Sequence, residues 1–295
     1  MHKSGFINII GKPNVGKSTL MNSLLGEKMS IITSKPQTTR HRILGIYNDD
    51  DTQVIFSDTP GLIEDPSYGM HDSMNRFAYS SFEDADVLLF VLDLFEDYEG
   101  DEKVIKLLKK TNIPKYLVIN KIDLDKDDKL ANLKAKWSEL MKFDKTFEIS
   151  ALNKTGLEEL MSSILSELKE GPAYYPKDQL SDKNVRFFVS EIVRECILTQ
   201  YKQEVPYSCE VIIDEYKDSE KNGKPFAHIY GTIYVSRKTQ KGILIGKAGS
   251  AIKKLGTDSR KKIEEFVGHP VFVQMNVKVR EGWRDDERQL KHFGY

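Results

Sequence analysis

Apolar and polar residues are arranged in two different ways along the chain, and the change comes near residue 170. In residues 1–169, short runs of consecutive apolar residues are separated by amphipathic stretches. Helices are expected after Lys17, Met70, Gly100, Asp127 and Gly156, and strands at FINII, ILGIY, QVIFS, DVLLFVLD, KYLVIN and TFEIS. Continuously apolar strands that alternate with helices are typical of a mostly parallel sheet with helices on both faces.

Residues 185–295 have a different order of elements. A helical segment is followed by two strand-like segments, then by two helical pieces divided at GKAG (246–249), and last by the strand-like PVFVQMNVKVR. That last segment alternates strictly between apolar and polar residues, which indicates a sheet covered on one side only. The Pro- and Gly-containing segment 170–184 predicts a linker between an α/β domain over 1–169 and an α+β domain with a C-terminal tail over 185–295.

Composition is that of an ordinary globular protein. The 295 residues, 39% of them hydrophobic, are enough for two domains that each have a core. No apolar run approaches the roughly 20 residues of a membrane span, and a start that runs directly into a strand predicts no signal peptide. The only two cysteines, Cys196 and Cys209, argue against a disulfide scaffold and favour the cytoplasm.

The net charge of −1 hides an asymmetry between the two regions. Residues 1–180 hold 23 basic and 29 acidic residues, or −6, whereas residues 181–295 hold 21 and 16, or +5. Within 237–262, nine basic residues face the single acid Asp258, or +8. Only the second region is therefore expected to meet a polyanion, although charge alone leaves a solvated helix face as an alternative.

The segment GKPNVGKST (11–19) matches the phosphate-loop pattern Gly-x-x-x-x-Gly-Lys-Ser, with a strand before it and a helix after it. The glycines let backbone N–H groups close around phosphates, and the helix N-terminus adds partial positive charge. Lys17 is expected to reach the β- and γ-phosphates, and Ser18 to ligate Mg²⁺. The predicted nucleotide-binding residues here are Gly11, Lys12, Pro13, Asn14, Val15, Gly16, Lys17, Ser18 and Thr19.

The segment DTPGL follows an apolar strand and is expected beside the γ-phosphate, with Asp58 on Mg²⁺ directly or through a water. It adds the site residues Asp58, Thr59, Pro60, Gly61 and Leu62. Many nucleoside triphosphatases have a water-orienting Gln after this Gly, but Leu62 offers no hydrogen bond. A Thr of the polar loop 30–42 is expected on Mg²⁺ when the γ-phosphate is present, and we favour Thr39 over Thr38.

Two further segments at strand ends predict guanine recognition. In NKID, the carboxylate of Asp123 can accept hydrogen bonds from guanine N1–H and its 2-amino group, and adenine has neither donor there. Lys121 can lie over the base, Asn120 can tie this loop to the phosphate loop, and SAL offers N–H groups to guanine O6. The predicted residues are Asn120, Lys121, Ile122, Asp123, Ser150, Ala151 and Leu152.

Together these motifs, over the first 170 residues, resemble the small GTPases of the translation-factor class. GTPases with an apolar residue at the position of Leu62 form a known group. Similarity to potassium-activated GTPases implies that Asn14 helps to hold K⁺ against the phosphates, where a cation stabilises transition-state charge as an arginine finger does. The alternative for Asn14, a residue that tolerates a tight turn, stays open.

In the second region, GKAG is a glycine-flanked turn that lets a nucleic-acid backbone approach closely. Alone it could be a loose turn between helices. Within the order helix, strand, strand, helix, helix, strand and the +8 segment, it resembles a type II KH domain. The predicted RNA-binding residues are Gly246, Lys247, Ala248, Gly249, Lys253, Lys254, Lys261 and Lys262.

A GTPase followed by such a domain resembles the Era family of bacterial GTPases over almost the whole chain, through KPNVGKSTL, QTTRHR, DTPGL, NKID, LIGKAG and WRDDERQLKHFGY. The resemblance implies binding of GTP, GDP and Mg²⁺, binding near the 3′ end of 16S rRNA, and a role in assembly of the 30S ribosomal subunit, with GTP controlling whether the KH surface is free. It also implies peripheral contact with the inner membrane, for which no amphipathic basic-aromatic segment stands out. We expect a monomer.

Two functions stay open at this point. The first is a slow GTPase stimulated by K⁺, which Asn14 favours. The second is a GTP-gated RNA-binding module with negligible intrinsic turnover, which Leu62 favours.

Overall fold

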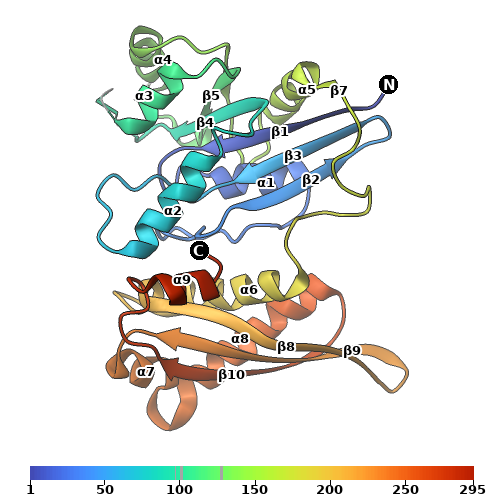
Figure 1. Cartoon of the computed structure of the whole chain (residues 1–295), viewed down its shortest axis with the longest axis vertical. Coiled ribbons are helices and arrows are strands. Elements are labelled where there is room, and N and C mark those ends of the chain that lie inside the picture. The colour runs from blue at the N-terminus through green and yellow to red at the C-terminus, as the bar shows by residue number, and fades with distance from the viewer. Residues whose placement is uncertain (97, 100–101, 127–128) are drawn as a thin grey trace. The chain divides into compact units, whose positions relative to one another are not determined.

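The structure is a computed structural model that describes residues 1–96, 98–99, 102–126 and 129–295 (Figure 1). The chain forms two compact units. The first comprises Met1–Ser67 and His71–Asp182, and the second Tyr68–Met70 and Lys183–Tyr295. The helix starts expected just after Gly100 and Asp127 fall at positions outside the described residues. No helix in the described part of the chain has both the length and the apolar character needed to cross a membrane.

The first unit alternates strands and helices as predicted. Its elements are β1 (Lys3–Ile10), α1 (Lys17–Leu25), β2 (Ile43–Asn48), β3 (Thr52–Asp58), α2 (Gly69–Ser80), β4 (Val87–Asp93), α3 (Lys103–Lys110), β5 (Lys115–Asn120), α4 (Lys129–Leu140), β6 (Lys145–Glu148), α5 (Leu157–Glu167) and β7 (Lys169–Glu170). The first two residues of α2 group with the second unit. The sheet has the order β2-β3-β1-β4-β5-β6, and β7 pairs with β1. It is mostly parallel, because among the strands that the structure describes only β2 and β7 run antiparallel to their partners.

Helices cover both faces of this sheet, which explains its continuously apolar strands. All seven residues of β4 are buried. On one face, Ile105 of α3 and Trp137 of α4 pack in a core with Phe90 of β4. On the other face, the hydroxyl of Tyr116 in β5 donates to Glu167 of α5 at 2.9 Å. A strand that is buried on both faces has no position for a polar alternate residue.

The parallel strands bring the predicted motifs to one edge of the sheet. Ile9, near the end of β1, is level with Asp58 at the end of β3, and Asp93 of β4 is level with Asn120 of β5. The phosphate loop, Asp58 and NKID therefore follow neighbouring strands at their carboxyl ends. Open α/β sheets bind ligands outside this edge.

The segment predicted as a linker lies on the first unit as far as Asp182. Ser4 Oγ donates to the carbonyl of Pro172 at 2.8 Å, and Gln53 Nε2 donates to the carbonyl of Tyr175 at 2.8 Å. The first unit consequently extends beyond residue 169.

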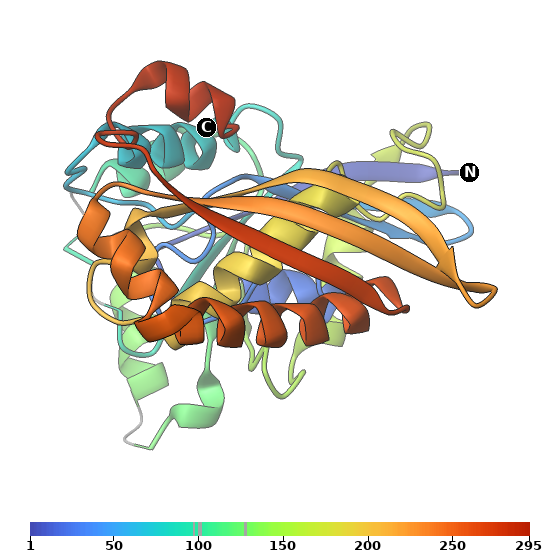
Figure 2. The same cartoon turned by 90° about the horizontal axis from the view of Figure 1, so that it is seen from below.

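The second unit has the predicted order of elements. They are α6 (Val185–Gln200), β8 (Cys209–Lys221), β9 (Lys224–Val235), α7 (Lys238–Ile245), α8 (Ser250–Val267), β10 (Val271–Val279) and α9 (Glu287–His292). The strands lie side by side in the order β10-β9-β8, with β10 parallel and β8 antiparallel to β9 (Figure 2). Apolar residues of α6, α7 and α8 share one core with one face of the sheet, as the alternation in the last strand predicted.

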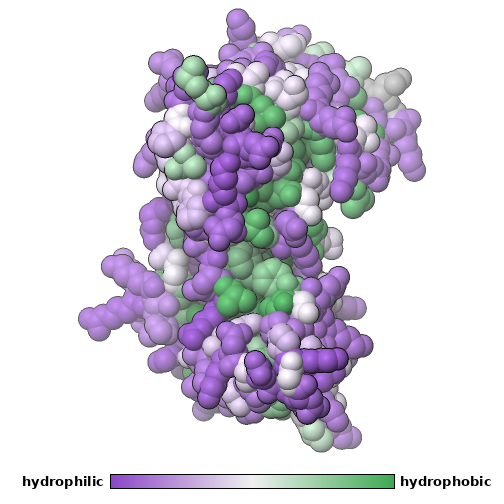
Figure 3. All heavy atoms as spheres, turned by 90° about the vertical axis from the view of Figure 1, so that its right-hand side faces the viewer, coloured by the Kyte–Doolittle hydropathy of each residue, from purple (hydrophilic) through white to green (hydrophobic). Residues whose placement is uncertain are grey.

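Hydrophilic side chains dominate the surface of both units on the side shown in Figure 3. This agrees with a chain in which 30% of the residues are charged.

Candidate nucleotide site and nucleic-acid interface

The phosphate loop is built around the buried ammonium group of Lys17. Its Nζ donates to the carbonyls of Gly11 at 3.0 Å and Lys12 at 2.7 Å. Burial lowers the pKa of Lys17 to about 8, and the charge of Asp58 partly opposes this shift. Gly16 has φ 98°, and a Cβ there would lie 2.2 Å from Asn120 Nδ2. Only glycine therefore allows the loop to approach NKID so closely.

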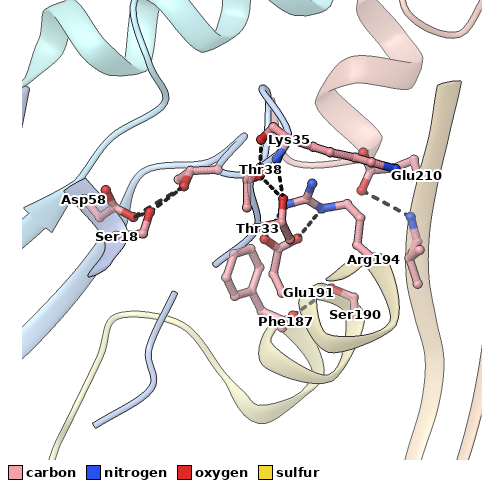
Figure 4. Close-up of polar contacts among 12 residues, drawn as sticks. Ser18, Thr33, Lys35, Thr38, Asp58, Phe187, Ser190, Glu191, Arg194 and Glu210 are labelled. Carbon is pink, nitrogen blue, oxygen red and sulfur yellow. Dashed lines mark hydrogen bonds and ion pairs between the residues drawn. The ribbon is translucent and has the colours of Figure 1, made fainter. Parts of the chain in front are cut away.

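Three side-chain oxygens meet beside Lys17. Ser18 Oγ donates to Asp58 Oδ2 at 2.6 Å (Figure 4). The same Ser18 Oγ lies 2.9 Å from Thr39 Oγ1. Asp58 is fully buried, and its Oδ1 has no hydrogen-bond partner among the described residues. Burial raises the pKa of this carboxyl, whereas the hydrogen bond from Ser18 and the charge of Lys17 lower it.

This oxygen cluster suits a hard divalent cation. Mg²⁺ prefers oxygen ligands and is usually held by one or two protein side chains together with phosphates and waters. Because Oδ1 of the buried Asp58 carboxylate has no hydrogen-bond partner among the described residues, it could accept a metal ion or a metal-bound water. Thr38, in contrast, is engaged in its own loop, since its Oγ1 lies 2.7 Å from Thr33 Oγ1 and donates to the carbonyl of Lys35 at 2.6 Å (Figure 4).

A cavity of about 440 Å³ runs from the phosphate loop to the NKID and SAL segments. Asn120 joins these parts, because its Nδ2 donates to the carbonyl of Val15 at 2.9 Å and its Oδ1 accepts from the N–H of Ala151 at 3.0 Å. Lys121 Nζ donates to the carbonyl of Asn14 at 2.8 Å and pairs with Asp93 at 2.5 Å. The walls of the cavity are thus tied to one another by side chains.

Some of the predicted nucleotide-binding residues line this cavity and others do not. Its walls include Pro13, Asn14, Gly16, Lys17, Ser18, Thr19, Thr38, Thr39, Gly61, Asn120, Lys121, Asp123, Ser150 and Leu152. The structure does not place Gly11, Lys12, Val15, Asp58, Thr59, Pro60, Leu62, Ile122 or Ala151 in that lining. Sequence reasoning missed further lining residues, namely Ile31, Ile32, Thr33, Ser34, Gln37 and Leu124. The apolar pair Ile31-Ile32 inside a polar loop was the available signal.

Leu62 is a core residue. Its side chain is only 7% exposed and belongs to the apolar cluster that contains Ile10 and Phe90. Its backbone N–H donates to the carbonyl of Gly11 at 3.3 Å. Leu62 therefore fixes the start of its loop against the phosphate loop.

Asn14 lies in the cavity wall with a left-handed backbone, at φ 66°. Its Nδ2 donates to the carbonyl of Ser34 at 3.3 Å. The backbone fits a tight-turn residue and the exposed side chain fits a ligand, so both interpretations of Asn14 are compatible with its position.

In the second unit, GKAG forms a defined turn between α7 and α8. Gly246 and Gly249 have φ 71° and 77°, and Ala248 has φ 51°. Lys247 and Ala248 are exposed. The positive φ values turn the chain sharply at these exposed residues, as close contact with a nucleic-acid backbone requires.

The four predicted helix lysines differ in their surroundings. Lys253, Lys254 and Lys261 are exposed on α8. Lys262 is half-buried and its Nζ donates to Glu195 of α6 at 2.9 Å, while the Glu195 side chain is only 6% exposed. Lys262 is therefore engaged within the fold, whereas the other three lysines face solvent.

Family models match both units. Residues 6–121 match the 50S ribosome-binding GTPase family, and residues 204–284 match the KH domain family. The chain is similar to GTPase Era of Clostridium kluyveri, at 45% identity over 296 residues and 100% of both chains. It is also similar to GTPase Era of Lactobacillus helveticus, at 44% identity over 99% of this chain and 96% of the relative.

Two solved Era structures match at a TM-score of 0.93 and 39% identity. One is Aquifex aeolicus Era, crystallised as a variant with GDP·AlF4⁻, which covers 99% of each chain. The other is Era in complex with MgGDPNP and nucleotides 1506–1542 of 16S ribosomal RNA, with 100% of this chain and 99% of the other covered. The predicted architecture of a P-loop GTPase domain followed by a KH domain is confirmed. By its identity to these proteins over the full length, the chain belongs to the Era family of GTPases.

Proposed function

We propose that this GTPase binds GTP with Mg²⁺ in the cavity of its first unit and binds the 3′ end of 16S rRNA through the GKAG surface of its second unit, in the course of 30S subunit assembly. One observation carries the proposal: a relative that matches over the full chain was solved with MgGDPNP and a 16S rRNA fragment together. A monomeric state stays a prediction, and peripheral membrane contact stays an implication of the family resemblance.

For the nucleotide, each contact is assigned to a group that the structure positions. Lys17 and the N–H groups at the start of α1 would bind the β- and γ-phosphates. Ser18 and Asp58 would hold Mg²⁺, and Thr39 would join them only in the triphosphate state. The ion would neutralise charge that develops on the phosphate oxygens during transfer. The converging oxygens and the unpartnered Asp58 Oδ1 support this assignment.

Guanine selectivity is assigned to Asp123, which lies in the cavity wall within the NKID segment. Asn120 holds NKID to both the phosphate loop and SAL. Contacts of the protein itself therefore position the base pocket, which favours discrimination between purines.

Because Leu62 is committed to the core, the group that orients the attacking water must come from elsewhere. We assign Asn14 as a ligand of K⁺ beside the phosphates, where the cation would stabilise transition-state charge. The alternative, in which GTP mainly acts as a conformational ligand and intrinsic turnover is negligible, is favoured by the burial of Leu62.

Single-turnover hydrolysis separates these alternatives. We expect measurable conversion of GTP by the full chain, faster in K⁺ than in Na⁺ at equal ionic strength. In the same samples, a fluorescent single-stranded oligonucleotide of the 16S rRNA 3′ end should bind. A chain that binds the RNA but converts no GTP in either salt would favour the conformational-ligand alternative, and a chain that binds no RNA would contradict the rRNA assignment.

A further inference from the structure

The sheet of the second unit has two faces, and α6, α7 and α8 cover only one of them. On the opposite face, the C-terminal residues cover one end. The ring of Phe293 lies 5.2 Å from Tyr234 of β9 and 5.3 Å from Trp283, and the hydroxyl of Tyr295 donates to Glu210 of β8 at 2.7 Å. The other end of this face, around the start of β9 and of β10, receives no such cover from the described C-terminal residues.

This uncovered end carries four rings, which we call the ring patch: Phe226, His228 and Tyr230 of β9, and Phe272 of β10. His228 and Phe272 are directly paired in the ladder. The ring centroid of His228 lies 5.2 Å from that of Phe226 and 5.8 Å from that of Phe272. The ring centroids of Tyr230 and Phe272 lie 6.0 Å apart. The four rings thus form one continuous surface across two strands.

The ring patch is open to solvent. Phe272 is 42% exposed, and Phe226, His228 and Tyr230 are partly exposed. Cross-strand aromatic pairs stabilise a sheet, but this would explain buried rings as well as exposed ones. The exposure of adjoining rings on a folded domain points to a ligand with flat, apolar faces.

The charges beside the ring patch define that ligand further. At alternate positions that share this face, β8 and β9 present Lys217, Lys221 and Lys224 near the rings. Lys221 Nζ lies 5.4 Å from the ring centroid of Phe226. Two acids also reach this face of β8: Glu215 is paired with Tyr230, and Asp214 accepts a hydrogen bond from Thr232 at 2.8 Å. Gln274 and Asn276 of β10 add exposed amides. Rings flanked by lysines and amides suit bases joined by phosphates.

We propose that the ring patch is a second RNA-binding site, on which unpaired bases stack outside the stretch that GKAG holds. Sheets with exposed aromatic residues stack two or three bases in this way in other RNA-binding folds, and stacking on aromatic rings tolerates any base. GKAG lies between helices that pack on the opposite face of the sheet. An RNA strand that contacts both sites must therefore be longer than the few nucleotides that a KH turn clamps.

The test compares two single-stranded RNA probes of mixed sequence, one of about 8 and one of about 20 nucleotides, chosen to fill one site or both. The full chain is compared with the variant Tyr230→Leu/Phe272→Leu, which keeps apolar side chains but removes two rings. We expect at least about fivefold weaker binding of the long probe and unchanged binding of the short one. The salt dependence should keep its slope, because stacking releases no counterions.

Two matched variants separate stacking from other effects. Tyr230→Phe/Phe272→Tyr keeps both rings and should bind the long probe within about twofold of the parent, a difference below about 0.4 kcal/mol. Lys217→Ala/Lys224→Ala should reduce the salt slope for the long probe instead. In addition, 4-thiouridine in the long probe should crosslink to peptides that contain residues 226–230 or 272.

The proposal is overturned if the leucine variant binds the long probe as the parent does, a result that would leave the ring patch to a protein partner. It is also overturned if the ring-preserving variant loses as much affinity as the leucine variant. The GKAG assignment is tested separately, by binding of the short probe to the Lys247→Asp/Ala248→Asp variant. That variant should lose the short probe while the long one still crosslinks at the ring patch.

Discussion

The nucleotide cavity and the GKAG surface present their positive charges in opposite ways. In the cavity, the charged groups are buried and tied together: Lys17 is held by two carbonyls, and Asp58 by Ser18. On the GKAG surface, Lys247 and Lys253 are exposed, and the positive charge comes from several independent side chains. A buried, connected site should lose function through single changes, whereas an exposed, additive one should lose it gradually.

The largest single effect is expected at Asp123. Replacing Asp123 with Asn removes a charged acceptor of two hydrogen bonds from guanine, which should weaken GTP binding by about 100-fold or more. Preference should shift toward xanthosine triphosphate, whose 2-oxo group accepts a hydrogen bond from the Asn amide. Competition titrations with both nucleotides check this.

The matched control for that change is Asp125→Asn. Asp125 lies two residues further on and accepts from the backbone N–H of Lys129 at 3.0 Å, outside the cavity lining. It should leave nucleotide selectivity unchanged. Unaltered GTP affinity in Asp123→Asn would show that NKID does not contact the base.

An intermediate effect is expected at Thr39. Thr39→Ala should weaken binding of a GTP analogue by about tenfold, which is about 1.4 kcal/mol, and spare GDP, because this hydroxyl joins the ion only in the triphosphate state. Thr38→Ala is the control, since Thr38 is engaged with Thr33 and Lys35. Fluorescence titrations with both nucleotides in Mg²⁺ measure the difference. Equal losses for GDP and for the GTP analogue would refute the assignment.

A smaller effect concerns the cation. If Asn14 holds K⁺, Asn14→Ala should remove the severalfold difference in single-turnover hydrolysis rate between K⁺ and Na⁺. The affinity for GTP should stay the same. Leu62→Ala, a change in the core, should retain that ratio even where it lowers stability. Rates that do not depend on the cation in the unaltered chain would favour a water-orienting group supplied by a partner.

The smallest effect tests the additive character of the RNA surface. Lys261→Glu should weaken RNA binding only about twofold to threefold and make the salt dependence shallower, as the loss of one phosphate contact does. Lys262→Glu should cost folding stability instead, because it places a second acid beside the buried Glu195. Salt titrations and urea unfolding distinguish the two. An equal loss of RNA affinity without loss of stability in Lys262→Glu would show that its ion pair with Glu195 opens on binding.

Local patterns were enough to predict the fold and the main loops. The strands of the first unit are continuously apolar because helices bury both of their faces. β4 could therefore be found from its run of apolar residues alone. The phosphate loop and NKID could be placed because each needs particular residues at a strand end, and the parallel register then brings them together.

Contacts between residues that are far apart in the sequence could not be predicted. The ion pair of Lys262 joins α8 to Glu195 of α6, and nothing local marks it. The burial of Leu62 depends on Phe90 and other residues of later strands and helices. The packing of Phe293 against Tyr234 likewise joins the end of the chain to β9. Each depends on tertiary packing, which periodicity does not encode.

The central claim is that GTP and RNA bind to separate sites, with GKAG as the RNA clamp. The most direct test is a titration of the Lys247→Asp/Ala248→Asp variant with a single-stranded oligonucleotide of the 16S rRNA 3′ end and, separately, with GTP. Lys291→Asp/His292→Asp, on exposed positions of α9, is the control with a matched change of charge. We predict that RNA affinity falls more than tenfold in the GKAG variant only, while GTP affinity stays within about twofold. Unchanged RNA affinity in a GKAG variant with an intact circular dichroism spectrum would contradict the account.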